Sequence, residues 1–127
     1  AQRRAGPYNV FAKMLLPALA KAAQRTARGQ TLLDETLVAC ALERYRMQHN
    51  ELPDTLGALV PQFIPKIPND LFDGQPLRYK KNADGNYIIY SIGWNERDDG
   101  GVAVQRIGST PHPDPNQGDW VWSFRAK

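Results

Sequence analysis

The stretch TLLDETLVACALERYRMQHN, Thr31–Asn50, decides the fold of this chain. Its apolar residues recur every three or four positions, which is the spacing of a helical face. They form two adjacent rows: Leu33, Leu37, Ala41 and Tyr45 in one, Val38 and Leu42 in the other. Pro53 disfavours helical geometry at the residue before it, Leu52, so we expect the helix to stop near Asn50. The stretch therefore predicts the C-terminal part of a substantial helix.

The preceding stretch, NVFAKMLLPALAKAAQRTARGQ, continues the same periodicity toward the N-terminus. Asn9 is a suitable N-cap for it. Pro17 removes one backbone hydrogen bond and predicts a kink or a break, and Gly29 weakens the helix further. We therefore expect one long interrupted helix, or two stacked helices, from about Asn9 to His49. Packing against a core or a partner is favoured over a helix lying on a membrane surface.

The second half of the chain predicts a short crossing segment followed by a small sheet. Residues 50–76 are rich in proline, and Asp54 can cap a short helix there. Strands are expected at 77–81, at 87–92 after the Asp84-Gly85 turn, and within DWVWSF at 119–124, with a long loop over 93–118. The fold class is α+β: a single domain, 1–127, with the helix packed on a three-stranded antiparallel sheet.

Composition excludes several classes of function. The chain has 127 residues and a net charge of +3, and six basic residues occur among the first thirty without an acid. A solvated helix face is the favoured interpretation of these charges, although they could meet phosphates or an anionic membrane. No aromatic residues interleave with them, so we expect no nucleic-acid partner. The sequence contains no run of eighteen apolar residues, so we expect no segment of it to span a membrane.

Cys40 is the single cysteine, so no intrachain disulfide can form. Its neighbours, LVACALE, predict a buried thiol that behaves as a small apolar group. Nothing in the sequence brings His49 or His112 to it, which disfavours a nucleophilic role. With no other catalytic constellation in view, we expect a protein that is not an enzyme.

The most distinctive polar stretch is YSIGWNERDDGG, Tyr90–Gly101. Calcium takes six to eight oxygen ligands from carboxylates, amides and carbonyls. Asn95, Asp98 and Asp99, together with the later Asp119, could supply such oxygens. A solvated turn is the competing interpretation. A catalytic acid pair is disfavoured, because adjacent carboxylates in one turn rarely take the opposed positions that acid–base chemistry needs.

Three motifs in order resemble the major pseudopilins of type II secretion systems. ALERYRMQHNELPDTLGALV resembles the end of that family's long helix. IPKIPNDLFDGQPLRYKK resembles its next segment, and DGNYIIYSIGWNERDDGG resembles the strand and loop that follow. The second motif matches at Asp70, Gly74, Pro76, Leu77 and Tyr79. The resemblance covers about residues 39–101, and GDWVW matches a terminal pattern more loosely.

The resemblance implies a pilin-like fold and a structural or interaction role in a secretion or pilus-like assembly. It implies pilin-like subunits or secretion-apparatus proteins as partners, and the bacterial envelope or periplasm as the location. It also implies calcium in the loop, bound by the backbone carbonyl of Ile92 and the side chains of Asn95, Asp98, Asp99 and Asp119.

The chain departs from the family in two places. AQRRAGPYNVFAKMLL does not match the apolar, membrane-inserting segment that opens the family's mature chains, and Asn95 replaces a turn aspartate. Because Ala1 is not a methionine, we expect that an upstream segment was removed or that the head is fused to something else. Membrane contact is then expected only through a segment missing from this chain.

The aromatic residues suggest an alternative function: a carbohydrate- or protein-binding module of a larger envelope protein. Trp120 and Trp122 would share one face of a strand, and stacked indoles can hold sugars. Packing of these rings between sheet and helix is favoured, because a small sheet needs large side chains to bury enough area.

Overall fold

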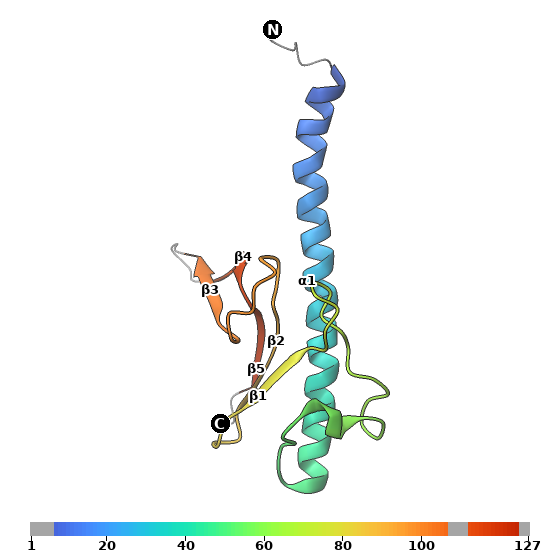
Figure 1. Cartoon of the computed structure of the whole chain (residues 1–127), viewed down its shortest axis with the longest axis vertical. Coiled ribbons are helices and arrows are strands. Elements are labelled where there is room, and N and C mark those ends of the chain that lie inside the picture. Colours follow the sequence, from blue (N-terminus) through green and yellow to red (C-terminus); the bar gives the residue numbers. More distant parts are fainter. Residues whose placement is uncertain (1–6, 107–111, 125–127) are drawn as a thin grey trace.

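The computed structural model describes residues 7–106 and 112–124, which form one long helix beside a small β-rich head (Figure 1). The elements are α1 (Pro7–His49), the 3₁₀ helix η1 (Leu56–Leu59), β1 (Arg78–Lys81), β2 (Tyr87–Ser91), β3 (Ala103–Arg106), β4 (His112–Gly118) and β5 (Trp120–Phe124). The predicted α+β fold, with a helix packed on an antiparallel sheet, is confirmed.

α1 runs without a break through both positions where an interruption was predicted (Figure 1). Pro17 lies inside the helix, which continues past it although proline has no backbone N–H to donate. Gly29 has no non-neighbouring atom within 4 Å of the place where a Cβ would lie, so its cost is mainly backbone entropy. The helix also begins at Pro7 rather than with a cap at Asn9, because proline's fixed φ suits a first helical position.

Only the C-terminal part of α1 packs against the head. Of the two predicted rows, Val38 and Leu42 are fully buried, whereas Leu33 and Leu37 are exposed. The buried face contacts β2, β5 and η1. Cys40 was predicted to be buried, but it is exposed. It lies two positions from both Val38 and Leu42, which puts it on the side of the helix opposite these buried residues.

The main sheet has the order β1-β2-β5 and is antiparallel throughout, which confirms the three predicted strands. One face of it carries three pairs that lie opposite each other: Tyr87 with Phe124, Ile89 with Trp122 and Ser91 with Trp120. Tyr87 and Ile89 are buried in the same cluster as Val38 and Leu42 of α1. This face of the sheet therefore forms the core with the helix.

The prediction of a long loop over residues 93–118 is wrong for the second part of that range. β3 and β4 pair there as a separate two-stranded antiparallel ribbon, with Ala103 opposite Gly118. The sequence of β4, HPDPNQG, contains two prolines and no alternating apolar residues, so it carries no strand signal. A two-stranded ribbon tolerates prolines because each strand has one free edge. Residues 107–111 lie outside the described part of the chain.

The crossing segment closes the lower end of the helix in the view of Figure 1. Leu56 and Leu59 of η1 are buried against the core. The predicted cap at Asp54 is wrong: Thr55 occupies the N-cap position, and the Asp54 carboxylate pairs with the ammonium group of Lys81. The Tyr79 hydroxyl donates to the Pro53 carbonyl oxygen at 2.9 Å and joins β1 to this segment.

Candidate functional site

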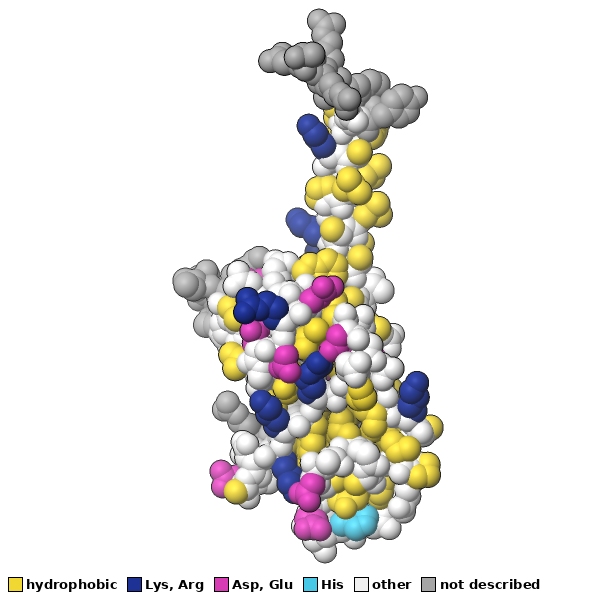
Figure 2. Space-filling model, viewed as in Figure 1, with side chains coloured by type: hydrophobic (Ala, Val, Ile, Leu, Met, Phe, Trp, Pro, Cys, Tyr) yellow, Lys and Arg dark blue, Asp and Glu magenta, His cyan; other side chains and the backbone are white. Residues whose placement is uncertain are grey.

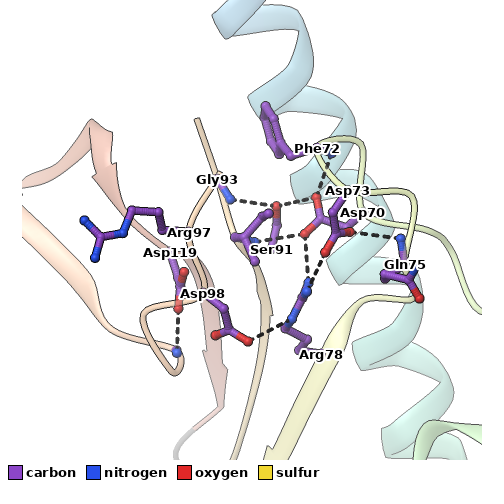
Figure 3. Close-up of polar contacts among 12 residues, drawn as sticks. Asp70, Phe72, Asp73, Gln75, Arg78, Ser91, Gly93, Arg97, Asp98 and Asp119 are labelled. Carbon is purple, nitrogen blue, oxygen red and sulfur yellow. Dashed lines mark hydrogen bonds and ion pairs between the residues drawn. The ribbon is translucent and has the colours of Figure 1, made fainter. Parts of the chain in front are cut away.

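Asp70 is the centre of the densest polar cluster in the described part of the head (Figure 3). It lies in the turn that leads into β1, and its side chain is fully buried. Its carboxylate accepts hydrogen bonds from the Phe72 N–H at 3.0 Å, the Ser91 hydroxyl at 2.9 Å and the Ile92 N–H at 2.9 Å. Arg78 completes its surroundings at 3.2 Å. Asp70 thus joins the crossing segment to β2.

Arg78, on β1, links three aspartates from different segments: Asp70 and Asp98, each at 3.2 Å, and Asp73 (Figure 3). Burial disfavours the charged form of Asp73, but hydrogen bonds from Arg78 and from the Gln75 backbone outweigh it and lower the pKa of Asp73. A backbone hydrogen bond from Gly100, helped by Arg78, lowers the pKa of Asp98. The Arg78 guanidinium therefore holds the loop between β2 and β3 (residues 92–102, the acidic loop) against the crossing segment.

Asp119 anchors the acidic loop from the other side. It directly precedes β5 and is 2% exposed. Its carboxylate accepts from the Asp99 N–H at 3.1 Å and from the Gly101 N–H at 2.6 Å, and its own N–H donates to the Val102 carbonyl at 2.9 Å. The loop is thereby fastened to the start of β5.

The five predicted calcium ligands fall into separate environments. The Asn95 amide donates to the Asp99 carboxylate at 3.1 Å, and Asp99 in turn donates its N–H to Asp119, so these three residues lie in one chain of contacts. Asp98 pairs instead with Arg78, and the Ile92 N–H donates to Asp70. Within residues 7–106 and 112–124, no three Asp, Glu, His or Cys side chains form a group that could hold a metal.

This donor set fits calcium in part. The Asn95 amide and the carboxylates of Asp99 and Asp119 are oxygen ligands of the kind that calcium accepts, and hydrogen bonds join the three residues although Asp119 lies just before β5. Asp98 does not fit, because the guanidinium of Arg78 already compensates its charge.

The aromatic residues of β5 face the helix. Trp120 is 6% exposed, and the Arg28 guanidinium of α1 lies 5.7 Å from its ring centroid. Trp122 stacks on Tyr87 with ring centroids 5.9 Å apart. These contacts support the packing interpretation: Trp120 is buried, and Trp122 is half-buried in a stack on Tyr87. Trp94, 38% exposed, lies outside this face and meets Phe72 edge to face.

A cavity of about 120 Å³ lies between α1 and the junction of the ribbon with β5. Thr31 and Glu35 of α1 line it, and each residue is 3% exposed. The hydroxyl oxygen of Thr31 and Oε1 of Glu35 are buried and have no hydrogen-bond partner in the part of the chain that the structure describes. Sequence reasoning missed both residues, although their spacing of 31, 35, 38 and 42 continues the buried row of Val38 and Leu42.

Glu35 makes stability fall with rising pH. Burial first, and then the charge of Asp70, raise the pKa of Glu35 from 4.5 to about 9, against a smaller opposing effect of Arg28. Between these two pH values the folded state keeps a proton that the unfolded state releases, so unfolding becomes easier as pH rises.

Glu35→Gln is therefore expected to stabilise the fold at pH 8 by about 1–3 kcal/mol, because it removes a carboxyl group that is costly to bury. At pH 4.5 the difference from the wild type should largely vanish. Urea unfolding at both pH values measures it, and an equal difference at both would contradict the assignment to Glu35 ionisation.

Comparisons with protein-family models, with curated proteins and with solved structures found no match. Among the described residues, no helix combines the length and the apolar character needed to cross a bilayer.

Proposed function

We propose that this chain is a non-enzymatic structural module, similar to a pseudopilin head, that assembles with other pilin-like subunits through the N-terminal half of α1. The observation that carries the proposal is the exposure of that half. Six large apolar side chains on it are between 50% and 70% exposed: Val10, Phe11, Met14, Leu15, Leu16 and Leu19. Figure 2 shows hydrophobic side chains gathered on the part of the helix that extends beyond the head.

Such a surface favours helix-to-helix contact. Phe11, Met14, Leu15 and Leu19 follow the spacing of one helical face, and contiguous exposed apolar surface on a protein usually marks an interface. The Gln24 side-chain amide of the helix donates to the Asn116 side-chain oxygen of the ribbon at 2.8 Å, beyond this apolar segment. Packing with another subunit can therefore cover the segment without displacing the head.

The resemblance described for residues 39–101 supports the same role. It implies the bacterial cell envelope as the location, with secretion-apparatus or pilin-like proteins as partners. The Asp70 cluster is consistent with a structural rather than a catalytic role, since each of its carboxylates is engaged in holding segments together.

Leu15→Glu is expected to abolish self-association or co-assembly, because it places a charge in the middle of the exposed apolar face. Sedimentation velocity across a concentration series, with and without a pilin-like partner, measures the effect. Met47→Glu is the matched control: Met47 is 80% exposed near the other end of the same helix and should leave assembly unchanged. A wild-type chain that stays monomeric and binds no pilin-like subunit would refute the proposal.

We also propose that the acidic loop binds calcium through Asn95, Asp99 and Asp119, which would further fasten it to β5. At a calcium concentration one hundred times the Kd, the folded state is expected to gain about 2.7 kcal/mol. Thermal unfolding in calcium and in chelator measures this gain. Asp99→Asn should remove most of it, whereas Asp84→Asn, in the exposed hairpin turn, should not. Equal melting temperatures in calcium and in chelator would contradict the site.

A further inference from the structure

Two buried polar groups in the wall of the cavity beside Thr31 and Glu35 are left without partners. Among the described residues, Glu35 Oε1 and Thr31 Oγ1 have no hydrogen-bond partner, and the two residues lie one helical turn apart on the same face of α1. Leaving such groups unpaired is costly, and proteins normally satisfy them with a side chain, a water or a ligand. The cavity is therefore suited to a group that donates several hydrogen bonds within a small volume.

The charges around the cavity favour a cation. Asp119 lies in its wall, and the carboxylates of Asp70 and Asp34 act on Glu35 from nearby, against the single positive charge of Arg28. An anion would be repelled by the Asp119 carboxylate in the wall and, from outside the cavity, by those of Asp70 and Asp34. A cation would allow Glu35 to ionise without the full penalty of burying an unpaired charge.

The shape and lining narrow the kind of cation. The volume of about 120 Å³ corresponds to roughly four water molecules at about 30 Å³ each. Trp120 forms an aromatic wall, which attracts a cation through its ring. A primary ammonium group is compact and carries three N–H donors, whereas a guanidinium presents five donors in a wide planar fork and a quaternary ammonium presents none.

We propose that this cavity binds a primary ammonium group, with Glu35 Oε1 and Thr31 Oγ1 accepting its hydrogen bonds and Trp120 lying against it. Leu32 and Arg28, which are partly accessible to solvent, also line the cavity and give a ligand a way in. The ammonium group can belong to a free small amine or to the tip of a lysine side chain. The inference does not rest on the proposed assembly, because it concerns a different part of α1.

Titration of the ¹⁵N-labelled full chain with methylammonium chloride tests the proposal, with sodium chloride and tetramethylammonium chloride at the same ionic strength as references. We expect saturable shifts of the Thr31 and Glu35 amide signals and of the Trp120 indole signal. Two non-hydrogen atoms limit the Kd to roughly 5–50 mM. Shifts no larger than those in the two reference salts would overturn the proposal and leave a water-filled cavity.

Three variants of the chain locate the binding. Glu35→Gln keeps the side-chain volume but removes the carboxyl group that can ionise beside a bound cation, and it is expected to weaken binding at least tenfold. Thr31→Val should weaken it about threefold, since one acceptor is lost. Glu51→Gln, at an exposed position, should bind as the wild type does. Unchanged affinity in either cavity variant, with a dispersed spectrum that shows it is folded, would refute the assignment.

A second titration identifies the source of the ammonium group. Nα-acetyl-lysine methylamide carries the group at the end of a side chain, as a partner protein would. Shifts at the same three residues support capture of a lysine tip. Binding of methylammonium alone also supports the site and restricts its ligand to free amines.

Discussion

Replacing Asp70 with alanine is expected to lower the free energy of unfolding by about 3–5 kcal/mol, because it removes one member of a buried, charged hydrogen-bond network. The Ser91 hydroxyl and the N–H groups of Phe72 and Ile92 would each lose their acceptor. Arg78 would lose its fully buried partner at the same time. The variant should therefore loosen the turn before β1 and the end of β2 together.

Urea unfolding at pH 7 measures this loss, and two further variants interpret it. Asp70→Asn retains the shape but places an amide against donors, so we expect it to remain clearly destabilised. Asp54→Asn removes a solvent-exposed carboxylate that pairs with Lys81, and little change is expected there. A loss below about 1 kcal/mol for Asp70→Ala would mean that the network carries little of the head's stability.

Gly118→Ala is expected to cost about 2–4 kcal/mol, because it combines an unfavourable backbone conformation with a collision. Gly118 has φ of +73° and ends β4 opposite Ala103. A Cβ there would lie 2.5 Å from the Val104 nitrogen and 2.9 Å from the Val102 carbonyl oxygen. Both are backbone atoms: Val104 lies in β3, and Val102 lies just before it. The two strands of the ribbon would therefore have to separate to admit a methyl group.

Gly85→Ala separates these two causes. Gly85 has a similar φ of +77° but has no non-neighbouring atom within 4 Å of its Cβ position. It should show only the conformational cost, about 1–2 kcal/mol. Hydrogen exchange of the β3 and β4 amides, measured with thermal unfolding, places the additional loss of Gly118→Ala in the ribbon. Equal losses for the two variants would contradict the close approach at Gly118.

Local pattern was enough to predict the parts of the fold that depend on local interactions. The spacing of Val38 and Leu42 predicted the helix, and Asp84-Gly85 between two alternating stretches predicted the hairpin of β1 and β2. The ribbon was missed because HPDPNQG has no strand-like composition, and its pairing depends on a partner in another part of the loop. The N-cap position of the short helix is likewise Thr55 rather than Asp54, whose carboxylate pairs with Lys81 from β1.

The polar sites were harder to predict, because they depend on contacts between distant residues. Asp98 was grouped with Asn95 and Asp99 by proximity in sequence, whereas Arg78, twenty positions earlier, determines where its carboxylate lies. Asp70 entered only through a family resemblance, and its partners come from β1 and from the end of β2. Periodicity shows that Glu35 shares the buried face of α1, but it cannot show that the space opposite Glu35 is left partly empty.

The uninterrupted α1 also has a mechanical consequence. With 43 residues it is about 65 Å long at 1.5 Å per residue, so its exposed half acts as a lever arm on the head. Pro17 is the weakest point of this lever, and it lies seven residues before Gln24, whose side chain is hydrogen-bonded to Asn116 of the ribbon. Lateral force on the tip should therefore bend the helix at Pro17 and leave the core around Leu42 undisturbed, whereas twist about the helix axis should turn the whole head.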